Sequence, residues 1–225
     1  MGVAALFDLD GTLVDSAPDI HAAASSMLRD LSLPPLPFGE AREYIGDGMA
    51  RFVKRVVTRQ WWGEPEESLL AAATGRMQFH YARECAGGRV YDGVIDTLAA
   101  LKKQGARLGC VTNKPHQFTL PMLDACALGE FFDTVISGDS LPTKKPDPAP
   151  LQEACRRLSA RCETTWMVGD SCADSRAAAA AGCRFAVVSY GYHRDGRLPP
   201  AEKIVYNFPE VLCLVIGENN VYDNR

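Results

Sequence analysis

After residue 90, short apolar runs alternate with segments of helical periodicity. The apolar runs lie at 107–111, 134–136, 165–168, 185–188 and, more weakly, at 204–206. Such an alternation predicts a parallel β-sheet whose strands are joined by right-handed helical crossovers. The opening run at 3–8 is continuously apolar up to Asp8, as expected for a strand covered on both faces. We therefore predict an α/β protein with a parallel sheet.

The first strand is separated from the rest of the sheet by about 70 residues that show helical patterns only. These patterns lie at 16–31, 40–44, 49–59 and 68–84, punctuated by Pro34–Pro37 and by Gly46 and Gly48. A helical stretch between two strands of one sheet is best explained as an insertion. We predict a core formed by residues 1–15 and 90–225 and a helical lobe formed by residues 16–89.

Composition narrows the possible partners. The formal net charge of −4 over 225 residues offers no basic field for nucleic acid or for an anionic membrane surface. No apolar run approaches the roughly 18 residues that span a bilayer, and we expect no secretory leader, because an apolar strand begins at residue 3 with no basic region before it. The eight cysteines are scattered without a C-x-x-C pair, so we expect small buried side chains in a reducing compartment rather than a metal cluster. We expect a cytoplasmic protein.

Polar side chains follow four of the predicted strands. In the order of the strands they are Asp8 and Asp10; Thr112, Asn113 and Lys114; Ser137 to Ser140, with Lys144 and Lys145 further on; and Asp170 and Asp174. Each group by itself is typical of an ordinary polar turn. Together they point to a binding site, because ligands of open parallel sheets bind beyond the carboxyl ends of the strands.

The residue types at these ends indicate phosphoryl chemistry. Asp8, Asp10 and Asp170 form a hard oxygen set that suits Mg²⁺. One carboxylate of the first pair can act as a covalent nucleophile for a phosphoryl group while the other transfers a proton.

The remaining polar residues fit the same chemistry. Thr112 and Asn113 can donate hydrogen bonds to phosphate oxygens, and Lys145 supplies positive charge. Asp174, one helical turn after Asp170, can hold a metal-bound water or orient Lys145.

Four short motifs along the chain resemble, in their order and spacing, those of a known enzyme superfamily. DLDGTLVDS, VTN, KKPDP and GDSCAD resemble the motifs of the haloacid dehalogenase-like superfamily. The resemblance implies a Rossmann-like core with an inserted helical cap, Asp8 as nucleophile and Asp10 as general acid and base. It also implies Mg²⁺ on Asp8, on the backbone carbonyl of Asp10 and on Asp170, with Thr112 and Lys145 holding the phosphate. Dehalogenases of the superfamily lack the second aspartate, so the presence of Asp10 favours phosphoryl transfer.

Further segments are similar to bacterial phosphoglycolate phosphatases. They are SGDSLPTKKPDPAPL, VTNKP and VSYGYH, together with the segment Ile45–Gly48 of the predicted cap. This similarity implies that Gly46 and Gly48 face the substrate. Asp47 departs from the usual asparagine between the two glycines. In the same region, Arg51, Lys54 and Arg55 are expected on the solvated face of a helix; the alternative for Arg51 or Lys54 is contact with a substrate carboxylate.

These observations predict a Mg²⁺-dependent phosphomonoester hydrolase that acts through an aspartyl-phosphate on a small substrate, most simply 2-phosphoglycolate. Three alternatives stay open: a phosphatase for another small phosphoester, a sugar-phosphate mutase of the same fold, and a non-catalytic binding protein. The expected partner is a small-molecule phosphoester, with neither nucleic acid nor membrane, for a monomer or a dimer.

Overall fold

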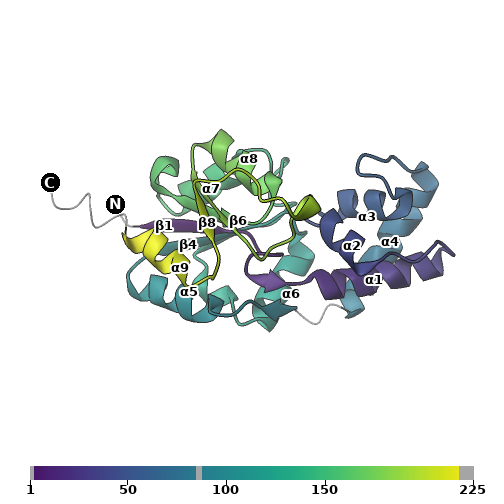
Figure 1. Cartoon of the computed structure of the whole chain (residues 1–225), viewed down its shortest axis with the longest axis horizontal. Coiled ribbons are helices and arrows are strands. Elements are labelled where there is room, and N and C mark those ends of the chain that lie inside the picture. The colour runs from purple at the N-terminus through teal and green to yellow at the C-terminus, as the bar shows by residue number, and fades with distance from the viewer. Residues whose placement is uncertain (1–2, 85–87, 218–225) are drawn as a thin grey trace.

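A parallel sheet lies at the centre of the computed structural model, with a helical lobe at one end (Figure 1). The structure describes residues 3–84 and 88–217. In spatial order the strands are β5 (Thr134–Ile136), β4 (Arg107–Val111), β1 (Ala4–Phe7), β6 (Trp166–Gly169), β7 (Arg184–Val188) and β8 (Lys203–Val205). Every neighbouring pair is parallel. The predicted α/β fold class is confirmed.

Helices cover both faces of the sheet (Figure 1). They are α5 (Val94–Lys103), α6 (His116–Ala125), α7 (Ala149–Arg157), α8 (Cys172–Ala181) and α9 (Glu210–Leu212). Ala5 and Phe7 of β1 join the hydrophobic cluster of α5, α6 and α9, whereas Ala4 and Leu6 join that of α7 and α8. Successive side chains of a strand point to opposite faces, so a strand covered on both faces must be apolar throughout.

Four helices form the lobe, called the cap below: α1 (Ala17–Asp30), α2 (Phe38–Tyr44), α3 (Met49–Thr58) and α4 (Glu67–Glu84). They surround a hydrophobic cluster of their own. In α1, the buried residues Ile20, Ala23, Ala24 and Met27 recur at helical spacing and form the face turned to this cluster.

The chain enters and leaves the cap through a short antiparallel ladder. Strand β2 (Val14–Asp15) pairs with β3 (Arg89–Val90). Two-residue strands leave no periodic pattern, so the sequence did not predict this ladder. It holds the two connections side by side at the boundary between cap and core.

Smaller departures from the predicted elements have local causes. The helix expected at 208–216 is divided into α9 and a π-helical turn, η4 (Cys213–Gly217), and Pro209 stands at the start of α9. Ser16 precedes α1 but makes no capping hydrogen bond, because its hydroxyl donates to Asp10 instead.

Three short 3₁₀ helices complete the secondary structure: η1 (Gly129–Phe131), η2 (Cys162–Thr164) and η3 (Arg194–Gly196). Within the described residues, no helix has the length and apolar character needed to cross a bilayer. The sequence also predicts hinges between core and lobe near residues 14–18 and 86–93 and a loose polar tail at 217–225; part of the second hinge and most of the tail lie outside the described residues.

Candidate active site

Polar residues from three adjacent strands meet at one end of the sheet. Asp8 directly follows β1, Thr112 follows β4, and Asp170 follows β6. Because these strands are parallel neighbours, their carboxyl ends lie at the same edge. All three side chains are buried. Lys145 reaches the same place from the loop after β5.

Lys145 is enclosed by oxygen atoms. Its Nζ donates to Asp8 Oδ1 at 2.8 Å, to Asp174 Oδ1 at 2.6 Å and to the carbonyl of Val111 at 2.6 Å. Burial lowers the pKa of Lys145, but Asp174 and Asp8 raise it by more, so the pKa lies above its ordinary value. The ammonium group therefore remains charged beside Asp8.

Asp174 is held from its other side by the first turn of α8. Its Oδ2 accepts from the backbone N–H of Ser171 at 3.0 Å and from the Ser171 hydroxyl at 2.6 Å. The Ser171 hydroxyl lies 3.3 Å from the backbone N–H of Asp174, which completes a capping box. Both oxygens of Asp174 are thus engaged, and the residue positions Lys145.

Asp8, Asp170 and Asp174 bring three carboxylates within 4.8 Å of one another. Burial raises the pKa of Asp8 to about 7; Lys145 opposes this shift, while Asp174 and Asp10 add to it. Burial, followed by the charges of Asp8 and Asp174, raises the pKa of Asp170 well above its ordinary range. One ammonium group does not balance three carboxylates, so the cluster favours a further cation.

Asp10 faces the cap side of the same site. Its carboxylate accepts from Lys114 Nζ, 3.0 Å from Oδ1 and 3.3 Å from Oδ2, and from the Ser16 hydroxyl. Lys114 also donates to the hydroxyl of Tyr81 on α4. Core and cap therefore share one buried polar network around Asp10.

The glycine segment of the cap lies against the loop that follows β4. Asn113 Nδ2 donates to the carbonyl of Gly46 at 3.0 Å and to that of Lys145 at 2.9 Å. Gly48 has φ of 85°, and a Cβ there would lie 2.8 Å from Lys144 Nζ and 3.0 Å from the carbonyl of Asn113. Only glycine fits this close approach with this backbone conformation.

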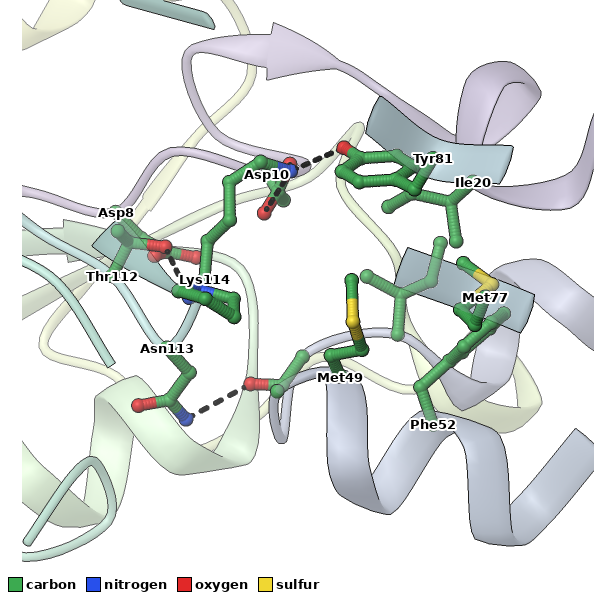
Figure 2. A pocket seen from close by; sticks show the side chains of 14 residues that line it. Asp8, Asp10, Ile20, Met49, Phe52, Met77, Tyr81, Thr112, Asn113 and Lys114 are labelled. Carbon is green, nitrogen blue, oxygen red and sulfur yellow. Dashed lines mark hydrogen bonds and ion pairs between the residues drawn. The ribbon is translucent and has the colours of Figure 1, made fainter. Parts of the chain in front are cut away.

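Two cavities border the site. One of about 50 Å³ lies beside Asp8 and Asp10 and is shown in Figure 2. Its polar side carries Asp8, Asp10, Thr112, Asn113 and Lys114, and its cap side carries the apolar residues Ile20, Ile45, Met49, Phe52 and Met77. A wider cleft of about 660 Å³ runs past Lys145 and Asp170 between cap and core.

The expectation that Arg55 lies on a solvated helix face is wrong. Its side chain is 1% exposed and forms an ion pair with Asp47. It also donates to the carbonyls of Tyr44, at 3.0 Å, and Trp61, at 3.3 Å. A buried guanidinium with three acceptors holds the segment that carries Gly46 and Gly48. Arg51 and Lys54, by contrast, pair with the exposed Glu64.

Lys114 and Tyr192 are site residues to which sequence reasoning assigned no role. Lys114 comes soon after the end of a strand, which indicates that it lies near the site. Its pairing with Asp10 could not be predicted, because the two residues are 104 positions apart. Tyr192 follows β7, and its backbone N–H donates to Asp170 Oδ2 at 2.6 Å. Its hydroxyl donates to Asp15 and accepts from the backbone N–H of Ser16 and Ala17. Tyr192 thereby joins the acidic cluster to the start of the cap.

The family model described as haloacid dehalogenase-like hydrolase matches residues 5–188. The chain belongs to this family. The match covers the core from β1 to β7 and the inserted cap, and it confirms the resemblance drawn from the four motifs. The predicted enzymatic class, a phosphoric monoester hydrolase, agrees with the names of the relatives.

Several curated relatives are phosphoglycolate phosphatases. That of Nitrosospira multiformis is 46% identical over 195 residues, which cover 86% of each chain. That of Nitrosococcus oceani is 43% identical and covers 84% of each. Among solved structures, a predicted phosphoglycolate phosphatase from Haemophilus somnus has a TM-score of 0.86 at 33% identity, covering 95% of this chain and 97% of its own. CbbY from Rhodobacter sphaeroides, solved with phosphate, has a TM-score of 0.79 at 27% identity, covering 94% and 96%.

Proposed function

We propose that this hydrolase cleaves 2-phosphoglycolate to glycolate and phosphate through an aspartyl-phosphate on Asp8. The observation that carries the proposal is the buried carboxylate of Asp8, which has one oxygen on Lys145 and lies in the same cavity as Asp10. The choice of 2-phosphoglycolate as substrate is supported by relatives that are named phosphoglycolate phosphatases.

Asp8 attacks phosphorus, so an oxygen–phosphorus bond forms as the ester bond breaks. Asp10 gives its proton to the departing glycolate oxygen. It then accepts a proton from the water that attacks the aspartyl-phosphate, which releases phosphate and restores Asp8. Lys145 offsets negative charge on Asp8 and the phosphoryl group, and Thr112 and Asn113 hold phosphate oxygens.

Asp8 and Asp170 would hold Mg²⁺, together with the backbone carbonyl of Asp10. The donor set fits this ion, because it consists of hard oxygens that carry more negative charge than Lys145 balances. Asp8 Oδ1 accepts from Lys145 and Asp170 Oδ2 from Tyr192; within the described residues, the second oxygen of each carboxylate has no hydrogen bond. When bound, the ion supplies positive charge for the phosphoryl oxygens.

We further propose that residues 16–89 act as a cap and residues 1–15 and 90–225 as the catalytic core. Apolar cap residues close the small cavity beside Asp8 and exclude water from the aspartyl-phosphate. The small volume, about 50 Å³, favours a small ester over a nucleotide.

The apolar wall supports a second candidate substrate class. Ile20, Met49 and Phe52 face Asp10 across the cavity and offer no cation to a substrate carboxylate. A small phosphoester with an apolar leaving group fits this wall without changing the chemistry.

Phosphate release with Mg²⁺ tests the proposal across a panel of 2-phosphoglycolate, hexose and amino-sugar phosphates, small alkyl phosphates, nucleotides and pyrophosphate. We expect the highest kcat/KM for 2-phosphoglycolate. A higher kcat/KM for an alkyl phosphate would show that the substrate is an alkyl phosphate and not 2-phosphoglycolate, with the same reaction mechanism. Absence of free phosphate with an isomerised sugar phosphate would establish a mutase instead, and absence of any turnover would favour a binding protein.

Asp8→Asn tests the mechanism. We expect kcat to fall by at least about 10³-fold, because a covalent nucleophile acts as a unit with its partners. Asp124→Asn, which changes an exposed carboxylate on α6, serves as the matched control. Turnover of Asp8→Asn close to that of wild type would rule out the aspartyl-phosphate.

A further inference from the structure

Three cysteines from three separate segments lie close together on the side of the sheet that α7 and α8 cover. Cys155 lies on α7, Cys162 on η2, and Cys183 directly before β7. Their sulfur atoms all lie within 4.8 Å of one another, and all three thiols are free. The scattered spacing of the cysteines in the sequence did not predict this proximity. We call them the thiol cluster.

The thiol cluster is set into the apolar layer between the sheet and helices α7 and α8. Cys155 and Cys183 are buried, and Cys162 is half-buried. The backbone around each cysteine is already paired: the Cys155 carbonyl accepts from Ala160, the Cys162 carbonyl accepts from Thr165, and the Cys183 N–H donates to Ala178, each at 2.9 Å. These bonds fix the three Cα positions independently of the thiols.

We propose that Cys155, Cys162 and Cys183 bind a soft, thiophilic metal ion of the Zn²⁺ class through three thiolates. Three thiols lose their protons to solvent as three sulfur–metal bonds form, with no change of oxidation state. Soft thiolate sulfur selects such ions over Mg²⁺, which takes hard oxygen ligands.

The separation of the sulfur atoms suits a metal better than a disulfide. Zn–S bonds of about 2.3 Å in a tetrahedral site place the sulfurs about 3.8 Å apart, so sulfur atoms within 4.8 Å of one another need to move by at most about 1 Å to close the site. A disulfide needs about 2.05 Å and leaves the third thiol unused. Cys162 is the least buried of the three, so we expect the ion to enter from its side and a water to complete the tetrahedron there.

This site is separate from the candidate active site. Cys162 and Cys183 precede β6 and β7, whereas Asp170 follows β6. The thiol cluster therefore lies at the amino ends of the strands, about 13 Å from the carboxyl ends, given four residues of β6 at about 3.3 Å each. A thiophilic ion at one end of the sheet and a hard ion at the other do not compete for ligands.

Titration of the full chain with Cd²⁺ tests the proposal. The reduced, metal-stripped protein is titrated without oxygen and in excess Mg²⁺, which keeps Cd²⁺ from the carboxylates. We expect an ultraviolet sulfur-to-cadmium charge-transfer band that saturates at one equivalent and is displaced by Zn²⁺. Cys162→Ser, the least buried change, should abolish this saturating band. The matched control Cys172→Ser/Cys213→Ser removes two exposed thiols and should keep it.

A saturating band that persists in Cys162→Ser, or no band in wild type, would overturn the proposal. A second measurement needs no variant: alkylation of native wild-type protein by iodoacetamide, read by peptide mass, should be blocked at Cys162 by stoichiometric Zn²⁺ and restored by EDTA. Equal alkylation of Cys162 with and without Zn²⁺ would overturn the proposed metal site. A disulfide within the thiol cluster that forms in air despite bound Zn²⁺ would overturn it as well.

Discussion

The ammonium group of Lys114 lies between the carboxylate of Asp10 and the hydroxyl of Tyr81, and its side chain is almost fully buried. A buried charge pair of this kind restricts both partners to one geometry. Asp10 is the proposed proton donor and acceptor, so we infer that Lys114 acts on the reaction by positioning Asp10.

We predict that Lys114→Met lowers kcat/KM by about 10²-fold, because general acid–base catalysis contributes typically 10²–10⁴-fold and depends on geometry. Steady-state phosphate release across pH measures the effect, and the profile should change shape as well as height. Lys103→Met, an exposed lysine on α5, is the control and should match wild type. An unchanged pH profile in Lys114→Met would show that Lys114 does not influence proton transfer by Asp10.

At the scale of elements, the amino end of α8 connects helix stability with the site. Ser171 caps this helix and also donates to Asp174, which in turn holds Lys145. One hydroxyl thus serves two functions, because the first turn of α8 comes directly after β6 and Asp170.

We predict that Ser171→Ala lowers the free energy of unfolding by about 1 kcal/mol, the usual loss of a helix cap. It should also lower kcat, because Asp174 loses an anchoring bond. Urea denaturation and phosphate release measure the two effects. Ser171→Thr keeps the hydroxyl and should preserve both properties. A loss of stability with full activity would show that Asp174 does not need this anchor.

Helix α3 also connects stability with the site, because its residue Arg55 holds the segment that carries Gly46 and Gly48. We predict that Arg55→Met lowers the free energy of unfolding by about 3 kcal/mol, since three hydrogen bonds of roughly 1 kcal/mol each are lost. KM should rise more than kcat falls, because Arg55 holds the glycine segment and not the reacting groups. Asp47→Asn, which keeps the Tyr44 and Trp61 contacts, should show a smaller change in both. Equal effects of the two substitutions would contradict this view.

At the scale of the whole molecule, the acidic cluster couples metal binding, pH and stability. The pKa of Asp8 is about 7 in the metal-free protein, against an ordinary 3.8, and that of Asp170 is also raised. The folded state therefore binds more protons than the unfolded chain between about pH 4 and 7. Stability of the metal-free protein falls as pH rises through this window.

We predict that Mg²⁺ raises Tm more at pH 8 than at pH 5, because ligand carboxylates must be ionised to bind the ion. Thermal unfolding with Mg²⁺ and with EDTA at both pH values measures the difference, and EDTA should also abolish turnover. In Asp170→Asn the Mg²⁺-dependent shift should shrink at pH 8. Equal shifts at both pH values would show that these carboxylates do not hold the ion.

The order of the elements, and the end of the sheet where the polar groups gather, can both be predicted from the amino-acid sequence. Strands covered on both faces are continuously apolar and helices repeat every three to four residues, so both can be read locally. The strands at 107–111 and 134–136 were predicted residue for residue, and the other four strands of the six-stranded sheet to within one position. Asp8, Thr112 and Asp170 could be proposed together because parallel strands end at one edge.

Which side chains come into contact depends on how the elements pack in three dimensions. The pairing of Lys114 with Asp10 joins positions 104 apart, the burial of Arg55 depends on Asp47 and Trp61, and the thiol cluster is assembled from three separate elements. Local periodicity reports which face of an element is buried, but not what covers it. The role of a charged or thiol side chain depends on the residues that pack against it. Those residues come from other elements, brought there by the packing of the cap on the core and of the helices on the sheet.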